Sequence, residues 1–328
     1  MSTAVTRRQA LAAASAMILA PSLGHAQMQD WPKGKSIRAV VPFPAGSSTD
    51  IIARVVLDVV GRNLGQTIVI ENRAGASGTT GSAAVAGSEP DGYTLLVHSS
   101  SHTVTPATFS KLTYSVENDF APIMPIATVP SVTVVNSGRG YKTLKDMADA
   151  AKAKPGSFNY ASAGAGSATH LTAERLRLAA KIEGTHVPFK GSAEAITEIL
   201  ADRIDFYCSP VNAAIGLIRE GKLTGLAVSS KNRASALPNL PTTVEAGFPD
   251  SGYEFWIGAF LPRNTPTAIR DRFHAELVKA LDDDSIKKRY AELGADVLKL
   301  SPAEFEAMVK KEIADNRVTV KAAGIKVN

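Results

Sequence analysis

The sequence has few of the features that mark disulfide-stapled domains, membrane proteins or nucleic-acid-binding proteins. A single cysteine, Cys208, stands among its 328 residues, so no intrachain disulfide can form. Aromatic residues are only 6%, and no basic run is interleaved with them, which argues against a nucleic-acid interface. The net charge is a modest +5, and 45% hydrophobic content suffices for one large or two medium cores. We expect Cys208 to be a small buried residue.

The first 26 residues contain no acidic side chain and have the pattern of an export signal. A pair of arginines precedes an apolar stretch at residues 10–20, and a small-x-small cleavage site ends at Ala26. The apolar stretch is shorter than the roughly 20 residues that a membrane span needs. We therefore expect a signal peptide at residues 1–26, a periplasmic chain that begins at Gln27, and export by either the Sec or the twin-arginine route.

Strand and helix signals alternate along the rest of the chain, which is typical of α/β folds with largely parallel sheets. Two halves share the order of a strand, a loop of small residues and a helix, at residues 39–56 and 158–178. Strands near residues 121–135 and 254–262 are suited to cross between the halves. We expect two lobes, which comprise residues 27–127 with 256–328, and 128–255, with a ligand in the cleft between them.

The first loop, PFPAGSSTD at residues 42–50, supports a structural and a functional interpretation. Ser47 and Asp50 stand at the N-cap and third positions of the following helix, which resembles a capping box with Asp in place of Glu. The same helix start offers bare N–H groups and about half a positive charge to an anion. Small side chains at residues 45–49 let a ligand carboxylate reach the backbone.

Two further loops repeat this pattern. In SAGAGSATHL, residues 162–171, Gly164 and Gly166 leave the backbone bare and Ser167 is expected to cap a helix. With the first loop on the opposite lobe, it forms a clamp for a ligand with two carboxylates. In PFKGSAEA, residues 188–195, Lys190 is either solvated at an ordinary strand-to-helix turn or part of a third binding loop, and Ser192 is the expected cap.

The segment HSSSHT, residues 98–103, is expected to be a loop after a strand. His98 and His102 are four residues apart, but a loop does not place them on one face, so we predict no metal site there. The hydroxyl groups of the serines, Ser100 among them, are expected to line a polar pocket.

Enzyme motifs are missing. Neither G-x-S-x-G nor H-E-x-x-H occurs, and the phosphate-loop-like run at residues 216–223 has Leu223 where a magnesium-binding hydroxyl is required. Ser167 and His170 lie three residues apart and could form a hydrolase pair, but no orienting acid is evident. We predict no catalytic residue, no metal and no cofactor.

The motifs taken together resemble the Bug-type (Bordetella uptake gene) receptors, the periplasmic solute-binding proteins of tripartite tricarboxylate transporters. The resemblance covers essentially the whole chain after the signal peptide. Each motif alone is unspecific, but their order is specific: PFPAGSSTDIIAR, IENRAGASG, PDGYTLL, NYASAGAGSATHL, HVPFKGSAEA, REGKLTGLAV and LPTTVEAGFP.

This resemblance implies an α/β, two-lobed periplasmic-binding-protein fold of type II, in which each lobe is a mostly parallel sheet flanked by helices and two strands cross between them. It implies a non-catalytic receptor for a small carboxylate, a two-component membrane permease as partner, and a monomer. The residues that match the family's binding loops are Phe43, Ala45, Gly46, Ser47 and Thr49 in the first lobe and Ala165, Gly166, Ser167 and Thr169 in the second.

Two positions depart from the family pattern. Ser47 stands where the family usually has a second glycine, and Ser209 stands where many members carry an aspartate that can pair with a ligand ammonium. We therefore expect Ser209 to face the ligand and the ligand to lack an amine: a di- or tricarboxylate, a hydroxy acid or an aromatic acid. A receptor that passes its ligand state to a membrane kinase has the same sequence features and stays an alternative, as does the hydrolase.

Overall fold

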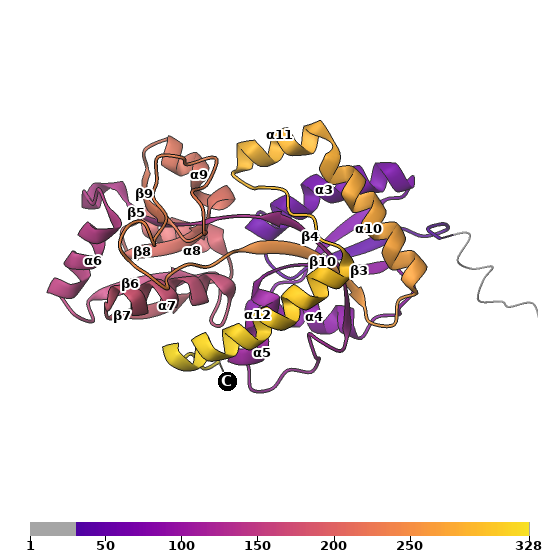
Figure 1. Ribbon diagram of the computed structural model, residues 1–328, viewed down its shortest axis with the longest axis horizontal. Helices are drawn as coiled ribbons and strands as arrows, with labels where there is room; N and C mark the ends of the chain where they lie inside the picture. Colours follow the sequence, from indigo (N-terminus) through magenta and orange to yellow (C-terminus); the bar gives the residue numbers. More distant parts are fainter. Residues whose placement is uncertain (1–30, 328) are drawn as a thin grey trace, which may run out of the picture.

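The computed structural model describes residues 31–327, and the predicted signal peptide and Gln27 lie outside that range. The described chain forms two sheets of five strands, each flanked by helices, which lie side by side in Figure 1. Two stretches of chain cross between them. The two-lobed α/β fold expected from the sequence is confirmed.

The first sheet has the strand order β2-β1-β3-β10-β4. Its strands β1, β2 and β3 are parallel, whereas β10 runs antiparallel to both β3 and β4. The bounds of these strands are β1 Ile37–Val41, β2 Ile68–Asn72, β3 Thr94–Ser99, β4 Phe120–Thr128 and β10 Trp256–Pro262.

The second sheet repeats this plan with the order β7-β6-β8-β5-β9. Here β6, β7 and β8 are parallel, and β5 runs antiparallel to β8 and β9. The bounds are β5 Ser131–Asn136, β6 Phe158–Ser162, β7 Gly184–Pro188, β8 Phe206–Pro210 and β9 Leu223–Val228.

The sheets are mixed because of the two crossings. The chain leaves the first sheet through β4 and enters the second as β5, with only Val129 and Pro130 between the two strands. It returns through residues 229–255 into β10, and the amide of Val129 donates to the carbonyl of Phe255 (2.8 Å), so the crossings lie side by side. A strand that arrives from the other lobe enters at the opposite end of the sheet, which makes β10 and β5 antiparallel to their neighbours.

Helices cover both sheets, and their ends follow local capping signals. Ser47 caps α3 and accepts from the amide of Asp50, and Thr143 forms a full capping box on α6. The helix bounds are α3 Ser48–Leu64, α4 Thr79–Ala86, α5 Ser101–Thr108, α6 Leu144–Ala153, α7 Ala168–Ala180, α8 Ser192–Leu200, α9 Val211–Arg219, α10 Thr267–Asp282, α11 Asp284–Leu293 and α12 Pro302–Ala323.

Two local predictions were wrong. Ser192 does not cap α8: Gly191 is the cap residue, and the Ser192 hydroxyl instead hydrogen-bonds the Tyr207 hydroxyl (2.9 Å). The segment at residues 98–103 is not a loop, because β3 extends through His98 to Ser99 and α5 begins at Ser101. Both His98 and His102 are fully buried among aromatic rings, and burial lowers their pKa.

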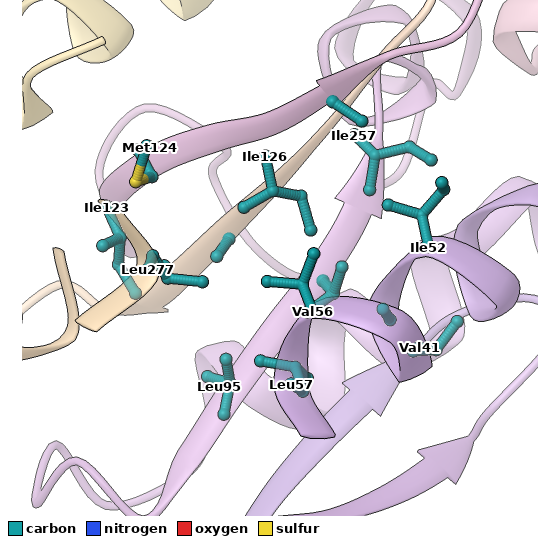
Figure 2. Close-up of a cluster of buried hydrophobic side chains, with 14 of the residues drawn as sticks. Val41, Ile52, Val56, Leu57, Leu95, Ile123, Met124, Ile126, Ile257 and Leu277 are labelled. Carbon is teal, nitrogen blue, oxygen red and sulfur yellow. The ribbon is translucent and has the colours of Figure 1, made fainter. Parts of the chain in front are cut away.

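The largest apolar cluster holds α3 and α10 against the first sheet. Figure 2 shows side chains of α3 meeting those of β1, β3 and β10 in its centre. The central residues include Val41, Ile52, Val56, Leu57, Leu95, Ile123, Met124, Ile126, Ile257 and Leu277. Because this core fixes α3, it also fixes the loop that starts α3.

The single cysteine is buried, as expected. Cys208 lies on β8, with its Sγ 3.7 Å from Thr133 Oγ1, and burial raises the pKa of its thiol to about 12. None of the helices within residues 31–327 is long and apolar enough to cross a bilayer.

Leu277→Ala tests the core under α10. Leu277 is fully buried, so its truncation should lower the free energy of unfolding by about 2–5 kcal/mol in urea titrations. The control is Val318→Ala on α12, which is 71% exposed and should change stability by less than about 0.5 kcal/mol. Similar losses for both variants would contradict this packing.

Candidate ligand-binding cleft

A small cavity, here called the inner cavity, lies where the two lobes meet. It leaves about 20 Å³ for the centre of a water-sized sphere, which is enough for one or two waters, each of which needs about 10–15 Å³. Both lobes contribute to its wall: Phe43, Ser47, Ser48, Thr49, Ser99, Ser101, Ala163, Thr169, Gly191, Ser192, Pro210 and Phe255.

The N-terminal ends of five helices converge on the inner cavity. Each helix leaves N–H groups of its first turn without intrahelical partners and carries about half a positive charge at that end. None of the lining residues has an ionisable side chain. The helix ends and their lining residues are α3 (Ser47, Ser48, Thr49), α5 (Ser99, Ser101), α7 (Thr169), α8 (Gly191, Ser192) and α9 (Pro210).

The acid closest to this wall in sequence, Asp50, is neutralised locally. Its carboxylate accepts from Arg54 Nε (2.9 Å), from the amide of Gly46 (2.8 Å) and from Asn72 Nδ2 (2.8 Å). Burial alone would raise the pKa of Asp50, but these partners outweigh burial and lower it. The charge of Asp50 is therefore compensated at the start of α3.

Hydrogen bonds between the lobes hold the cleft closed. The amide of Ala168 donates to Ser101 Oγ (2.9 Å), and Ser77 Oγ donates to the carbonyl of Ala165 (2.6 Å). Asn212 Nδ2 donates to the carbonyl of Ser48 (3.3 Å). The α7 and α5 helix starts are thus in direct contact across the cleft.

One buried hydroxyl in the cavity wall has no protein partner. Ser48 is 3% exposed, and no hydrogen bond to its Oγ is formed within residues 31–327; the same holds for Asn212 Oδ1. Buried polar groups are nearly always hydrogen-bonded, and an unpaired hydroxyl in a cavity wall is suited to a hydrogen bond with a ligand. The unpaired Ser48 hydroxyl lies among the helix N-termini that converge on the inner cavity.

A larger outer cavity adjoins the inner one. It leaves about 770 Å³ for the centre of a water-sized sphere, and Phe43 and Ala163 line both cavities. Its other lining residues are Pro42, Ala74, Gly75, Ala76, Ser77, Gly78, Phe109, Gly164, Ala165, Pro188, Phe189, Lys190, Glu194 and Val327.

Comparison with known proteins assigns the family. Residues 52–325 match the family described as "Tripartite tricarboxylate transporter family receptor". The chain belongs to this receptor family. It is a family of binding proteins rather than enzymes, which confirms the resemblance and the prediction of no catalysis.

Curated relatives span nearly the whole receptor. A protein from the tcbD-tcbE intergenic region of Pseudomonas sp. (strain P51) is 33% identical, with 94% of this chain and 92% of the relative covered. Protein BugT of Bordetella pertussis is 32% identical, with 89% and 90% covered.

Solved structures share the type II periplasmic-binding-protein fold. The periplasmic binding protein BugD is 31% identical with a TM-score of 0.86, covering 90% of this chain and all of that one. Rpa4515 of R. palustris with adipate is 31% identical (TM-score 0.87; 91% and 100% covered). MatC of Rhodopseudomonas palustris with bound malate is 32% identical (TM-score 0.83; 87% and 98% covered).

The receptor places the first-loop residues predicted from the sequence in different ways. Phe43, Ser47 and Thr49 line the inner cavity. Ala45 and Gly46 are exposed and line neither cavity among those described, and the amide of Gly46 is taken by Asp50.

The second-lobe residues predicted from the sequence also lie in different places. Thr169 lines the inner cavity, and Ala165 lines the outer one. Gly166 faces the other lobe, with its carbonyl 3.5 Å from Thr108 Oγ1. Ser100 and Ser209 are fully buried and line neither cavity; Ser209 Oγ donates to the carbonyl of Pro210.

Ser167 and His170 do not form a hydrolase pair. Ser167 Oγ caps α7 by accepting from the backbone amide of His170 (3.3 Å). The imidazole turns away, because its Nδ1 accepts from the amide of Gly166 (3.1 Å) and its Nε2 faces Glu174 (3.6 Å). The side chain of His170 therefore supports the loop instead of activating the serine.

Sequence reasoning missed half of the inner wall. Ser48 lies in the first loop and is the first residue of α3. No local sequence signal indicates that its buried hydroxyl has no hydrogen-bond partner among the described residues. Ser99 and Ser101 line the inner cavity, in line with the polar pocket expected for the serines of residues 98–103, although the helix that begins at Ser101 was not predicted. Gly191 and Ser192 belong to the third loop, which has the same small-residue pattern as the first two. Pro210 and Phe255 have no such local pattern, and only the tertiary fold places them in the cavity wall.

A buried polar network supports the second-lobe loop from below. The rings of His170 and His186 stack 3.6 Å apart, and His186 Nε2 lies 2.7 Å from Ser162 Oγ, which donates to the carbonyl of Gly164. Glu174 is hydrogen-bonded to Tyr160 and Arg177. In the described residues no cluster of three or more metal-ligating side chains occurs.

Glu174→Gln tests this network through its pH dependence. Burial alone would raise the pKa of Glu174, but the neighbouring His170 imidazole and hydrogen bonds from Arg177 and Tyr160 outweigh it and lower the pKa to about 2, from an ordinary value of 4.5. The stabilisation is therefore complete above pH 4.5 and is lost as the pH falls from 4.5 to about 2.

We expect the wild-type protein to lose roughly 1–3 kcal/mol more stability than Glu174→Gln across this interval. Melting temperatures at several pH values measure this, with Glu183→Gln, which removes an exposed carboxylate, as the control. Parallel pH profiles for wild type and Glu174→Gln would contradict the assignment.

Proposed function

We propose that this receptor captures a small organic carboxylate without an amine in the cleft between its lobes and delivers it to the membrane components of a tripartite tricarboxylate transporter. The observation that carries the proposal is the convergence of five helix N-termini on a cavity whose wall has no ionisable side chain. Such a wall attracts an anion without a counter-ion. A di- or tricarboxylate or an aromatic acid fits this description.

The energies involved are sufficient for tight binding. A hydrogen bond to a charged group contributes about 1.5–3 kcal/mol, and a partly buried helix end up to about 2 kcal/mol. A handful of these, less the costs of association and ordering, reaches the roughly −8 kcal/mol of micromolar affinity. No ion pair is needed.

Two observations support the ligand class. The related structures with adipate and malate hold amine-free dicarboxylates. In addition, no carboxylate lines the inner cavity, so a ligand ammonium placed there would be buried without a partner. The preference for an amine-free ligand does not depend on a contact between Ser209 and the ligand.

We further propose that Phe43, Ser47, Thr49 and Thr169 contact the bound carboxylate. Ser48 joins this set because it lies in the same cavity wall. We propose that the lobes comprise residues 27–127 with 256–328, and 128–255, a division that the two separate five-stranded sheets support. We propose that the receptor acts in the periplasm as a monomer, after removal of residues 1–26, with a two-component permease as its partner.

A thermal-shift screen of the purified protein against organic acids tests the function. A ligand at 100 times its dissociation constant stabilises by about 2.7 kcal/mol, which for a protein of this size raises the melting temperature by roughly 5–10 °C. We expect hits among amine-free carboxylates and smaller shifts for aspartate and glutamate. Tighter binding of the amino acids, or no shift with any carboxylate, would contradict the proposal.

Ser48→Ala separates binding from folding. Because the buried hydroxyl has no protein partner, its removal should leave the melting temperature of the unliganded protein unchanged or slightly higher. It should weaken carboxylate binding by about tenfold in calorimetric titrations.

The matched control is Ser192→Ala, in the same cavity wall. Its hydroxyl pairs with the Tyr207 hydroxyl, so this variant should cost about 1–3 kcal/mol of stability in the unliganded protein. A Ser48→Ala protein that loses stability but keeps full affinity would show that Ser48 has a structural role only.

A further inference from the structure

The inner cavity has room for the head of a ligand only. Its space of about 20 Å³ is that of one or two waters, which matches a single carboxylate group. Any ligand whose carboxylate enters it must place the remaining atoms elsewhere. The role inferred here for the outer cavity rests on the proposed function of the inner cavity.

The outer cavity is the place where the rest of a ligand can go. Phe43 and Ala163 line both cavities, so the two spaces adjoin at these residues, and a ligand with its head among the helix ends has the outer space next to it. That space, about 770 Å³, is within the range of ordinary ligand pockets.

The wall of the outer cavity is suited to an apolar body. Three phenylalanines contribute to it, Phe43, Phe109 and Phe189, together with prolines and Val327. Aromatic walls favour aliphatic chains and rings through burial and through edge-to-face contacts.

The two charged residues of the outer cavity do not favour a ligand that carries a second charged group. Lys190 and Glu194 are both exposed, and Glu194 Oε2 accepts from the backbone amide of Lys190 (3.1 Å). They bring one positive and one negative charge to the same rim. The apolar wall, and not a net charge, is therefore what distinguishes this cavity.

The wall is held in place by contacts between distant segments. The amide of Val327, near the end of the chain, donates to the carbonyl of Thr108 (2.9 Å), and this positions Val327 beside Phe109. On the other side, Ser77 holds Ala165 across the cleft. The closed arrangement thus presents a preformed outer cavity.

We propose that the outer cavity binds the apolar body of an elongated carboxylate, either an aliphatic chain of about six carbons or more or an aromatic ring, while the carboxylate head occupies the inner cavity. The receptor therefore selects long or aromatic acids over short hydroxy acids.

Calorimetric titration of the purified protein with straight-chain monocarboxylates from propanoate to octanoate tests this. Each methylene that enters the outer cavity should lower the dissociation constant by about fourfold, as expected for burial of one methylene. Benzoate should bind more tightly than propanoate for the same reason.

Ala74→Trp fills the outer cavity from an exposed loop residue that lines it, so the fold is not at risk. This variant should bind propanoate within about twofold of wild type and lose most of the gain from chain length. The control is Ala303→Trp, at an exposed position of α12 that lines neither cavity, which should keep the wild-type gain.

The outcomes separate the two proposals. If short acids bind and the dissociation constant does not fall with chain length, or if Ala74→Trp keeps the full gain, the outer cavity does not hold the ligand and only the inner site stands. If no carboxylate of any length binds, the proposed function fails, and this inference fails with it.

Discussion

The structure depends on one electrostatic arrangement: five helices begin at the same small cavity, and no ionisable side chain lines it. Each helix end contributes partial positive charge and first-turn N–H groups that have no carbonyl partner within the helix, so an anion is attracted by the backbone itself. Because these donors belong to fixed helices, they need little reorganisation when a ligand arrives. The compensated charge of Asp50 keeps a nearby acid from opposing this field.

The fold explains why the helix starts converge. Each of the five helices follows a parallel strand, β1, β3, β6, β7 or β8, and so begins at the carboxyl end of a sheet. Residues that follow the carboxyl ends of strands from both sheets line the inner cavity. The antiparallel strands β10 and β5 are the consequence of the two crossings between the lobes, which tie the lobes together beside the inner cavity.

Much of this could be predicted from the sequence, because the strand-loop-helix units carry strong local signals. The first two loops, with Ser47 and Ser167 as caps, were identified by small residues and capping positions alone. The α5 start was missed because a helix opening with Ser-His-Thr and containing Pro106 lacks a helical pattern. The unpaired state of Ser48 and the arrival of Phe255 depend on contacts between distant segments, which no local pattern reports.

The most direct test is a crystal structure of the protein with its tightest-binding carboxylate. We predict one carboxylate group in the inner cavity, with oxygens within hydrogen-bond distance of the Ser48 hydroxyl and of first-turn amides of α3, and with no basic side chain in contact. A carboxylate held instead by an ion pair with Lys190, and an inner cavity that holds only water, would contradict the account.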